Sequence, residues 1–518
     1  MTIDYALYLV TDSTPEILKG QNLVEIVEAA IDGGVTVVQY RNKSSPTLEV
    51  IRTCKEIHEV TKRQNVPLII NDHLDVAVAV DAEGVHIGQD DIDIRTARSI
   101  VGSDKIIGVT VSSVEEAIQA VENGADYLGI GTIFATPTKR NTDAIIGTGK
   151  LLSSLCLKNA LTFAAGTKNI LEAISSLKRN VATVVIGGIN HKNVQRVLFQ
   201  SKSSSKGLDG VAVVSAIIGA ENPKEAASKL RRLVDTPPPF IIDGPNYINK
   251  VSDVEVMRDS VVTVLDKLGE MNPLCHNMTN LVVQNFAANV ALAIGASPIM
   301  ANYGEEAEDL AALGGSLVIN MGTVTPDGLQ NYLKAVQAYN VCGGPVLLDP
   351  VGAGATGLRR RAVRELLAGG YYDVIKGNEG EIKTVLGEGD AQQRGVDSGA
   401  STSTEQERAG LVKKLAARER NVVLMTGVTD YLSDGKRTIA IGTTIAACLA
   451  VHREDKLLAA LAGILLFEIA AEKAAEHAEG PGTFVPAFID QLYRLTQEVA
   501  AGRAEEWVKL ANVQNVEV

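Results

Sequence analysis

Residues 35–43 read VTVVQYRNK, a run that begins like a buried strand and ends in polar and charged side chains. Side chains alternate between the two faces of a strand, so Gln39, Arg41 and Lys43 should share the face of Val35 and Val37. A row that changes from valine to glutamine, arginine and lysine no longer builds a hydrophobic core. The pattern therefore predicts a strand that leaves a core and presents cations to an anionic ligand.

The same arrangement, a short apolar run followed by an amphipathic helical stretch, recurs through the first 235 residues. We count eight predicted strands, at residues 5–12, 35–43, 66–72, 84–89, 105–111, 126–134, 182–189 and 209–217. Strands that alternate with helices form a parallel sheet, and eight units predict closure into a (β/α)8 TIM barrel. An open, doubly wound sheet is the structural alternative.

The repeating pattern breaks at residues 234–247, VDTPPPFIIDGPNY, where three consecutive prolines favour a stiff polyproline II spacer. We therefore predict a barrel domain over residues 1–235, a proline-rich linker over 236–250 and a second domain over 251–518. In the second domain, apolar runs end in glycine-rich polar turns, and alanine-rich helices close the chain. This pattern predicts an open α/β sheet covered by helices, with its site at the carboxyl ends of the strands.

The composition limits the partners of the chain. A formal net charge of -13 argues against nucleic acid or an anionic membrane as the main partner, although local cationic pockets can still bind small phosphorylated molecules. The five cysteines show no CxxC spacing, which argues against a disulfide framework or a zinc site and favours a reducing compartment. No secretion signal is visible, and the longest apolar run, at 457–467, is too short to span a bilayer. We expect a soluble cytoplasmic protein.

Polar side chains gather at the carboxyl ends of the predicted barrel strands, where TIM barrels carry their chemistry. They are Gln39, Arg41, Lys43, Asn71, Asp72, Gln89, Asp90, Asp91, Thr110, Thr136, Thr138 and Lys139. Arg41, Lys43 and Lys139 supply cations without a matching protein anion. The nearby carboxylates Asp72 and Asp91 predict Mg²⁺ held by carboxylate and substrate phosphate oxygens.

A second anion site is predicted beside the first. The glycines Gly187 and Gly188 lie at the end of the seventh predicted strand, and the amides of Val214 and Ser215 lie at the end of the eighth. This combination fits the phosphate cradle found in many barrels. The mouth is therefore expected to hold a metal-bound diphosphate and a separate monophosphate.

Several of these residues also have a purely structural interpretation. Arg41 and Lys43 fit a solvated strand end, and Asp72 fits a turn former or the N-cap of the helix that begins at Leu74. The GQDD turn at 88–91 fits a cap of the next helix, and His86 fits a hydrogen-bonded core histidine better than a base. The functional interpretation is favoured because five strand ends carry complementary polar groups, whereas the opposite ends carry none so organised.

Seven segments, in order, resemble thiamine phosphate synthase over essentially all of residues 1–235: QYRNK, IINDHLDVA, GVHIGQDD, GVTVSS, TPTK, IGGI and GVAVVSAI. That family joins 4-amino-2-methyl-5-hydroxymethylpyrimidine diphosphate to a thiazole phosphate and releases diphosphate. The resemblance implies that the pyrimidine diphosphate is held by Gln39, Arg41, Lys43, Asn71, Thr110 and Lys139. It assigns Mg²⁺ to Asp72 and Asp91, and it assigns the thiazole phosphate to Thr136, Thr138, Gly188, Val214 and Ser215.

The resemblance also implies a mechanism. The bond between carbon and diphosphate ionises first and leaves a pyrimidine-stabilised carbocation, which the thiazole nitrogen then captures. Such a step requires the leaving-group charge to be neutralised by Mg²⁺, Arg41 and lysine side chains. It needs no protein nucleophile or strong base, and none is evident in the sequence.

The second domain resembles hydroxyethylthiazole kinase over about 251–518. The matching segments are NPLCHNMTNLVVQNFAANVALAIGASPIMA at 272–301, LLDPVGAGAT at 347–356, VIKGNEGEI at 374–382 and LMTGVTDYLSDG at 424–435. The resemblance implies a ribokinase-like fold and ATP-dependent phosphorylation of the thiazole hydroxyethyl group, which makes the substrate that the barrel consumes. It places the thiazole at Asn280 and Met300, ATP at Lys376 and Thr426, and Mg²⁺ at Asp349 and Glu381. Taken alone, Met300 would more often be a core residue and Asp349 a turn residue.

One feature of the kinase family has no counterpart here. The family carries a glycine-rich anion-hole turn whose cysteine is its proposed catalytic residue, but in KRTIAIGTTIAACLAV at 436–451 the flanking segments abut directly. Cys448 lies too far into the following helix to replace that cysteine. Either the turn is deleted and the kinase is inactive, or a segment is missing from the sequence at this point. We favour the second interpretation because both flanks are intact, and we assign no catalytic residue.

The fused arrangement resembles the fungal enzymes of thiamine biosynthesis. Because the kinase family is trimeric, with its thiazole site between subunits, the resemblance implies a multiple of three protomers, and we predict a homohexamer. Two rival interpretations differ in class. A protein that binds thiamine intermediates without turnover is favoured only by the missing turn, and a different phosphate-binding barrel fused to a different kinase is disfavoured by QYRNK and TPTK.

Overall fold

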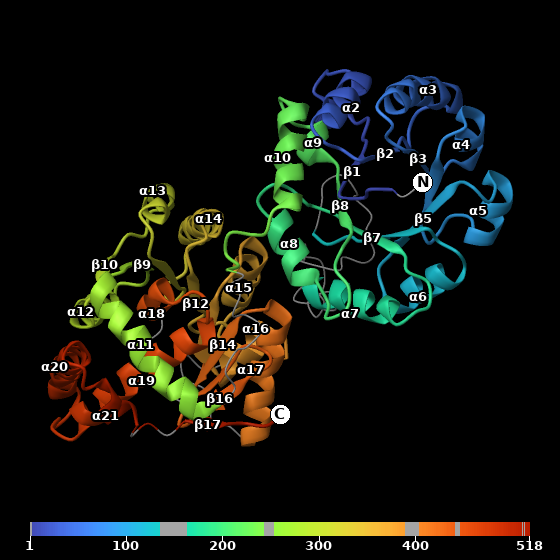
Figure 1. The fold of residues 1–518 in the computed structure, drawn as a ribbon. Helices are drawn as coiled ribbons and strands as arrows, with labels where there is room; N and C mark the ends of the chain where they lie inside the picture. The colour runs from blue at the N-terminus through green and yellow to red at the C-terminus, as the bar shows by residue number, and fades with distance from the viewer. Residues whose placement is uncertain are drawn as a thin grey trace. The chain divides into compact units, whose positions relative to one another are not determined.

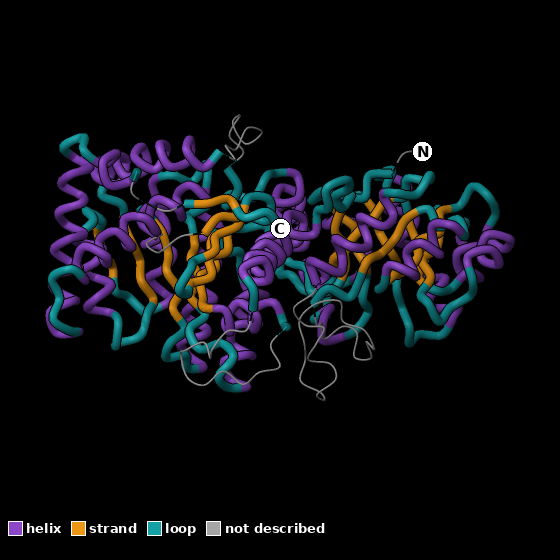
Figure 2. Tube along the Cα trace, turned by 90° about the horizontal axis from the view of Figure 1, so that it is seen from below, coloured by secondary structure: helices purple, strands orange, loops and turns teal. Residues whose placement is uncertain are grey.

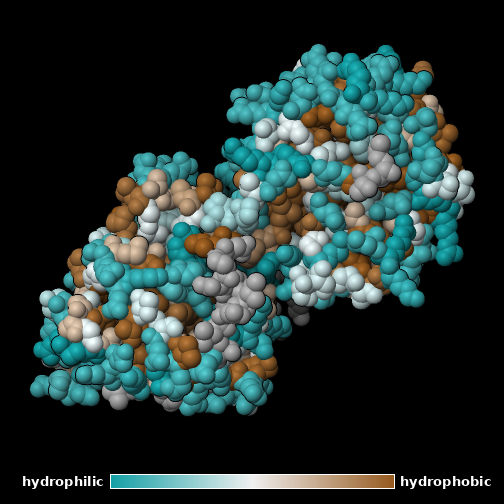
Figure 3. Space-filling model, in the orientation of Figure 1, coloured by the Kyte–Doolittle hydropathy of each residue, from teal (hydrophilic) through white to brown (hydrophobic). Residues whose placement is uncertain are grey.

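The computed structural model describes residues 3–134, 163–242, 253–388, 403–440, 446–509, 511 and 513–518 of the 518-residue chain. The chain divides into two compact units, Met1–Pro238 and Pro239–Val518, and each has its own hydrophobic core. In both units the strands lie inside and helices cover them (Figure 2). The visible face of each unit is mostly hydrophilic, with hydrophobic residues in scattered groups (Figure 3).

The first unit is a closed barrel of eight strands that pair in chain order (Figure 1). The strands are β1 (Leu7–Val10), β2 (Val37–Tyr40), β3 (Leu68–Asn71), β4 (Gly84–Ile87), β5 (Ile106–Val111), β6 (Tyr127–Ile130), β7 (Ala182–Ile186) and β8 (Gly210–Val213). All neighbouring pairs are parallel, and β1 pairs with β8 as well as with β2, which closes the sheet. The (β/α)8 barrel expected from the sequence is confirmed, and the open-sheet alternative is wrong.

Helices surround the barrel (Figure 1). They are α1 (Pro15–Leu18), α2 (Leu23–Asp32), α3 (Thr47–Arg63), α4 (Leu74–Val80), α5 (Ile94–Val101), α6 (Val114–Glu122), α7 (Phe163–Ser175), α8 (Val194–Ser201), α9 (Ser215–Ile218) and α10 (Pro223–Asp235). A polar side chain often starts them by accepting an orphan backbone amide: Asn22 caps α2, Asp93 caps α5 and Ser113 caps α6. These caps explain why the helices begin directly after polar residues of the preceding loops.

A small second core fills the inside of the barrel. Its members, which lie on the strands except for Tyr5 just before β1, are Tyr5, Tyr8, Val10, Val37, Ile69, Tyr127, Val184 and Ala212. Gly108 makes room for the largest of these rings, because a Cβ at that position would lie 2.0 Å from Cζ of Tyr127. The Tyr127 ring packs against Tyr5 and Tyr8, with centroid separations of 5.0 and 5.8 Å. The barrel is therefore a packed core with polar hydroxyl groups inside it.

Strand β2 ends earlier than the sequence pattern predicted. It stops at Tyr40, so only Gln39 of the polar row belongs to the strand, and Gln39 is buried. Arg41 and Lys43 lie in the loop that follows, where strand alternation does not fix the direction of a side chain. The predicted shared face with Val35 and Val37 is thus wrong for these two cations.

The second unit contains a nine-stranded sheet in the order β10-β9-β11-β12-β13-β14-β15-β16-β17. The strands are β9 (Leu274–Met278), β10 (Ser297–Ile299), β11 (Ser316–Asn320), β12 (Val346–Asp349), β13 (Val374–Asn378), β14 (Val422–Thr426), β15 (Tyr431–Ser433), β16 (Thr438–Ala440) and β17 (Gln514–Asn515). Pairs from β10 to β14 are parallel, whereas pairs from β14 to β17 are antiparallel. The open α/β sheet is confirmed, with an antiparallel edge that the sequence pattern did not predict.

Helices cover this sheet, and one of them is buried along most of its length. The helices are α11 (Val254–Met271), α12 (Gln284–Ala293), α13 (Ala307–Ala312), α14 (Pro326–Cys342), α15 (Gly357–Gly369), α16 (Glu379–Leu386), α17 (Glu405–Glu419), α18 (Ala446–Val451), α19 (Lys456–Ala475), α20 (Pro481–Ala500) and α21 (Ala504–Val508). α19 packs against α11, α18 and α20, which accounts for its apolar residues on all sides. None of the described helices is long and apolar enough to cross a membrane.

The proline run leads into a residue that belongs to the second unit. Phe240 is buried, and its ring stacks on Tyr371 with a centroid separation of 4.5 Å. Lys456 Nζ donates a hydrogen bond to the carbonyl oxygen of Phe240 at 3.2 Å. The stretch predicted as a linker therefore contains an anchor to the second unit, while residues 243–252 lie outside the described part of the chain.

Candidate functional sites

Three of the predicted pyrimidine residues lie on barrel strands. Gln39 is near the end of β2, Asn71 ends β3 and Thr110 lies in β5. Gln39 and Asn71 are buried, and Thr110 is half-buried. Because the strands are parallel and closed, these side chains meet at one end of the barrel. The polar positions at the strand ends thus come together as predicted.

The two cations that follow β2 each have a carboxylate partner. Arg41 Nη1 lies 3.7 Å from Asp12 Oδ2, and Lys43 Nζ lies 2.9 Å from Asp72 Oδ2. The expectation that these cations lack a protein anion is therefore wrong. Sequence reasoning missed Asp12, although its place at the end of the first predicted strand, comparable to that of Asp72, is a signal that was present. The backbone amide of Arg41 also donates to Thr11 Oγ1 at 2.9 Å, which fixes the start of the loop.

The two carboxylates predicted to bind a metal follow neighbouring strands. Asp72 follows β3 in the left-handed backbone region, with φ 60°, and its amide donates to the carbonyl oxygen of His86 at 2.9 Å. Asp91 follows β4, and its Oδ2 accepts the amide of Gly88 at 2.7 Å. The residues that cap the next helices are His73 and Asp93, so the helix-cap interpretations of Asp72 and of the GQDD turn are wrong.

Two carboxylates suit a hard divalent cation only if other oxygen atoms complete its coordination. Among the described residues, no group of three or more His, Cys, Asp or Glu side chains is arranged to hold a metal ion. The donor set of Asp72 and Asp91 therefore fits Mg²⁺ that shares its ligands with a phosphorylated substrate. It does not fit a metal held by the protein alone.

The predicted phosphate cradle follows β7 and β8, which are neighbours. Gly187 and Gly188 have φ of 108° and 67°, a region that favours glycine, and a Cβ on Gly188 would lie 2.8 Å from Cβ of Phe134. Val214 precedes the short helix α9, which begins at Ser215. Thr136, Thr138 and Lys139 lie outside the described residues.

In the second unit, four predicted or neighbouring polar residues form one connected row across the strand ends. Asn280 Nδ2 donates to Asn320 Oδ1 at 3.1 Å, and Asn320 Nδ2 donates to Asp349 Oδ2 at 3.0 Å. Lys376 Nζ lies 3.5 Å from the same Asp349 oxygen. Asn320, which sequence reasoning missed despite its place at a strand end, thus joins the predicted thiazole side to the predicted ATP side.

Burial governs the charges in this row. Burial raises the pKa of the Asp349 carboxyl, and the neighbouring Lys376 counters that shift. Burial also opposes the charge of Lys376, but Asp349 holds the pKa of that ammonium group above its ordinary value. Asp349 Oδ1 is buried and has no hydrogen-bond partner among the described residues, so it is the oxygen best placed to receive a cation.

Glu381, the other predicted metal ligand of the second unit, has both oxygens engaged. Oε1 accepts the amide of Gly352 at 2.7 Å, and Oε2 accepts the amide of Asn378 at 2.8 Å. Asn378 in turn accepts the amide of Glu381, which forms a capping box at the start of α16. Burial raises the pKa of Glu381, and the two amides oppose that shift. The carboxylate therefore ties the glycine-rich turn after β12 to the sheet.

The remaining predicted kinase residues lie at strand ends. Met300 follows β10, and its carbonyl oxygen accepts a hydrogen bond from Gln284 Nε2 at 3.3 Å. Thr426 ends β14, opposite Asn378 of β13 in register. Leu281 and Val282, next to Asn280, are 84% and 87% exposed. Two large apolar side chains thus face outward beside the predicted thiazole pocket.

Comparison with known proteins decides between the families considered. Residues 7–217 match the thiamine monophosphate synthase family, and residues 265–498 match the hydroxyethylthiazole kinase family. The probable thiamine biosynthetic bifunctional enzyme of Schizosaccharomyces pombe is 39% identical over 540 residues, which cover 99% of each chain. The chain belongs to the thiamine biosynthetic bifunctional enzymes.

Other relatives show the same division. The thiamine biosynthetic bifunctional enzyme of Saccharomyces cerevisiae is 33% identical over 551 residues, 98% of this chain and 97% of the relative. A thiamine-phosphate synthase of Clostridium botulinum is 46% identical over 230 residues, 44% of this chain and 98% of the relative. Both resemblances drawn from the sequence motifs are confirmed, and the interpretations as a non-catalytic binder or as another barrel and kinase are wrong.

The stretch that lacks the family's turn, residues 436–451, contains β16, α18 and the connection between them. Residues 441–445 of that connection lie outside the described part of the chain. The alignments with both yeast relatives, 540 and 551 residues long, exceed the 518 residues of this chain, so each relative carries residues absent here. Cys448 is buried in α18, and burial raises the pKa of its thiol to about 12. Cys448 is therefore unsuited to act in place of the family's cysteine.

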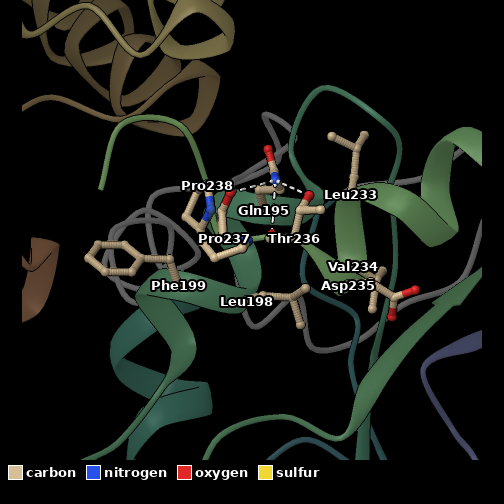
Figure 4. Close-up of a pocket in the computed structure, with 9 residues that line it drawn as sticks. All are labelled: Gln195, Leu198, Phe199, Leu233, Val234, Asp235, Thr236, Pro237 and Pro238. Carbon is tan, nitrogen blue, oxygen red and sulfur yellow. Dashed lines mark hydrogen bonds between the residues drawn. The ribbon is translucent and has the colours of Figure 1, made fainter. Parts of the chain in front are cut away.

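A surface cavity of about 270 Å³ lies on the barrel unit of the bifunctional enzyme, between α8 and the segment after α10 (Figure 4). It is lined by Gln195, Leu198, Phe199, Leu233, Val234, Asp235, Thr236, Pro237 and Pro238. Gln195 Nε2 donates to the carbonyl oxygens of Thr236 and Pro237, at 3.2 and 3.4 Å, and so fastens the start of the proline run to α8. The cavity shares no residue with the candidate sites.

Proposed function

We propose that this enzyme makes thiamine phosphate in two steps. The second unit phosphorylates 4-methyl-5-(2-hydroxyethyl)thiazole with ATP, and the barrel joins the resulting phosphate to 4-amino-2-methyl-5-hydroxymethylpyrimidine diphosphate. The observation that carries the proposal is the meeting of buried amides, paired cations and two carboxylates at one end of a closed barrel. That combination suits a substrate with a polar ring at one end and a diphosphate at the other.

In the barrel, Gln39, Asn71 and Thr110 hold the pyrimidine diphosphate together with Arg41, Lys43 and Lys139. Mg²⁺ at Asp72 and Asp91 supplies charge neutralisation for the departing diphosphate. Lys43 is exposed and paired with Asp72, so it can exchange that carboxylate for a phosphate oxygen when a ligand arrives. Arg41, held by the carboxylate of Asp12, keeps its guanidinium beside the leaving group.

The reaction follows a dissociative course in this proposal. The carbon–oxygen bond to diphosphate breaks first, and the thiazole nitrogen attacks the carbocation. The thiazole phosphate is held by Thr136, Thr138, Gly188, Val214 and Ser215 during this attack. The buried, close-packed barrel interior supports this course, because it keeps water away from the carbocation below the mouth.

In the second unit, the thiazole lies between Asn280 and Met300, and ATP contacts Lys376 and Thr426. Asp349 and Glu381 would hold Mg²⁺, and the oxygen of Asp349 that has no hydrogen-bond partner among the described residues supports its part. Lys376 offers a fixed positive charge to the phosphates, as phosphoryl transfer requires. Which group acts as the catalytic residue of this step is left unassigned.

We also propose that the enzyme assembles in a multiple of three protomers, as a homohexamer. The exposed Leu281 and Val282 beside Asn280 support an interface at the thiazole pocket. Sedimentation velocity measures the mass directly, and a monomer at micromolar concentration would contradict the assembly. The cytoplasmic location expected from the cysteine pattern remains a prediction.

The function is tested by incubating the purified enzyme with pyrimidine diphosphate, thiazole alcohol, ATP and Mg²⁺. Thiamine phosphate should form, and Lys139→Ala should abolish it while ATP consumption continues. Product that appears only when thiazole phosphate is supplied would show that the second unit is inactive as a kinase. No product with either thiazole would overturn the proposed function.

A further inference from the structure

Five side chains form one hydrogen-bonded chain inside the barrel. Gln39 Nε2 donates to Tyr8 Oη at 2.9 Å, and Tyr8 Oη lies 2.7 Å from Tyr127 Oη. His86 Nδ1 lies 2.8 Å from Tyr127 Oη, and His86 Nε2 lies 2.8 Å from Thr110 Oγ1. The proposed function uses the two ends of this chain, Gln39 and Thr110, and gives no role to the three residues between them.

The protons along the chain can be counted. Burial raises the pKa of the Tyr8 and Tyr127 hydroxyls, so each keeps its single proton at neutral pH. Gln39 donates to Tyr8, and Tyr8 then donates to Tyr127. Tyr127 donates to His86 Nδ1, which must be the unprotonated ring nitrogen. The proton of His86 therefore sits on Nε2 and is donated to Thr110 Oγ1.

With Gln39 donating to Tyr8 through Nε2, as in the structure, the opposite order fails at Tyr8. If His86 carried its proton on Nδ1, it would donate to Tyr127, and Tyr127 would donate to Tyr8. Tyr8 would then accept from both Gln39 and Tyr127, and its own proton would have no acceptor among its hydrogen bonds to described residues. Tyr8 is 1% exposed, so water cannot take that proton, and an unpaired buried hydroxyl is costly. If both ring nitrogens of His86 were protonated, the hydroxyl proton of Tyr8 would again lack an acceptor.

This order fixes what the two ends of the chain offer to a ligand. One N–H of the Gln39 amide donates to Tyr8 and holds the orientation of the amide, so the carbonyl oxygen is the acceptor that Gln39 offers, beside its second N–H. Thr110 Oγ1 already accepts from His86, so its own hydroxyl proton is left to donate. An acceptor on β2 and a donor on β5 thus face the same site.

We propose that Tyr8, Tyr127 and His86 are positioning residues that set this acceptor and donor pair, and that the pair selects a 4-aminopyrimidine over a 4-oxopyrimidine. The inference rests on the proposed function, because it concerns the same substrate site. An amino group donates to the Gln39 oxygen, whereas an oxo group at the same position presents a second acceptor to it. A Gln39 amide that turned over to meet the oxo group would bring its oxygen to Tyr8, and that bond would be kept only if Tyr8, Tyr127 and His86 all reversed their protons.

The proton order is tested without any turnover. ¹⁵N nuclear magnetic resonance of the full chain with labelled histidine reports the tautomer of each ring, and the His86 signals are those lost in His86→Gln. We expect the neutral His86 ring with its proton on Nε2. A proton on Nδ1, or on both nitrogens at neutral pH, would overturn the inference.

The selectivity is tested with the diphosphates of the 4-amino and 4-oxo pyrimidines, by comparing kcat/KM for the two. We expect the preference for the amino substrate to fall about tenfold in Tyr8→Phe, the effect of one hydrogen bond. Tyr127→Phe should lower it similarly, since it breaks the chain in the middle. Tyr5→Phe is the matched control, because the Tyr5 ring packs against Tyr127 but is not one of the five hydrogen-bonded side chains. The preference of this variant for the amino substrate should be unchanged.

The outcomes separate the two proposals. If wild-type enzyme makes no thiamine phosphate from the amino substrate and thiazole phosphate, the proposed function fails, and the histidine tautomer still decides the proton order. If Tyr8→Phe and Tyr127→Phe lose activity equally toward both pyrimidines, their role is only structural and the inference fails. Thermal unfolding of each variant shows that it is folded before its kinetics are compared.

Discussion

Each half of the molecule places a lysine beside an aspartate at the carboxyl end of parallel strands, but in different surroundings. In the barrel, Lys43 and Asp72 are 2.9 Å apart, and 57% and 22% of their side chains are exposed. In the second unit, Lys376 and Asp349 are 3.5 Å apart, with 28% and 15% exposed. Exposed pairs contribute little to stability, whereas each partner of a buried pair relieves the desolvation cost of the other.

The difference suits two kinds of ligand site. A pair at the barrel mouth can separate at low cost, so that the lysine meets a phosphate and the aspartate meets a metal. The pair in the second unit is held by burial and by Asn320, and its charges depend on each other. We therefore expect substitutions in the barrel pair to act mainly on activity, and those in the second pair to act on stability as well.

The largest effect is expected for Asp72→Ala. Loss of a metal-binding carboxylate should lower kcat/KM for thiamine phosphate synthesis by about 10³-fold, since the leaving diphosphate loses charge neutralisation. The assay supplies thiazole phosphate directly, so the second unit does not contribute. Asp75→Ala is the control, because Asp75 lies on α4 with 67% of its side chain exposed. Similar losses in both variants would contradict a specific role for Asp72.

Next in size is the stability difference between Lys376→Ala and Lys43→Ala. Lys376→Ala leaves Asp349 largely buried without its cation, so the free energy of unfolding of the second unit should fall by about 1–3 kcal/mol. Lys43→Ala should change the stability of the barrel by less than about 1 kcal/mol. Urea unfolding followed by circular dichroism measures both free energies. Equal losses of stability in the two variants would contradict the difference between the two ion pairs.

Two carboxyl groups, Glu83 in the barrel and Glu381 in the second unit, differ in the direction of their pKa shift. Burial alone would raise the pKa of Glu83 in the barrel, but hydrogen bonds from His58 and from the amide of Leu68 hold it below its ordinary value of 4.5. In the second unit, burial raises the pKa of Glu381. Stabilisation by Glu83 is thus present above pH 4.5 and is lost as the pH falls through its lower folded-state pKa, whereas the cost of burying charged Glu381 is relieved in acid.

We therefore expect the unfolding free energy of the barrel to fall more steeply between about pH 5 and pH 3 in the wild type than in Glu83→Gln. Urea titrations at a series of pH values measure the slope. Glu59→Gln, which changes an exposed glutamate on α3, should keep the wild-type slope. A Glu83→Gln variant with an unchanged slope would show that this carboxylate does not carry the effect.

The smallest effect is expected for Arg63→Ala. Arg63 Nη2 lies 2.8 Å from Glu28 Oε1, but 64% and 48% of the two side chains are exposed. The unfolding free energy should change by less than about 0.5 kcal/mol, because solvent screens such a pair. A loss as large as that of Lys376→Ala would mean that exposure does not separate the ion pairs of this molecule.

The sequence determined much of the architecture. Short apolar runs, separated by helical stretches, predicted all eight barrel strands, and the proline run marked the change to a second α/β pattern. The polar strand ends, from Gln39 to Thr110, predicted the end of the barrel at which the candidate site lies. These features are readable because secondary structure and the burial of one face depend on neighbours along the chain.

The tertiary structure decided which side chains meet. Asp12 pairs with Arg41 because β1 and β2 are paired neighbours. Tyr8 is linked to Tyr127 and His86 because closure of the barrel brings β1, β4 and β6 around one interior. Asn320 joins Asn280 to Asp349 because parallel pairing aligns the ends of β11 and β12. No local pattern encodes contacts between residues so far apart in the chain. They follow from register and closure, which become fixed only when the whole sheet forms.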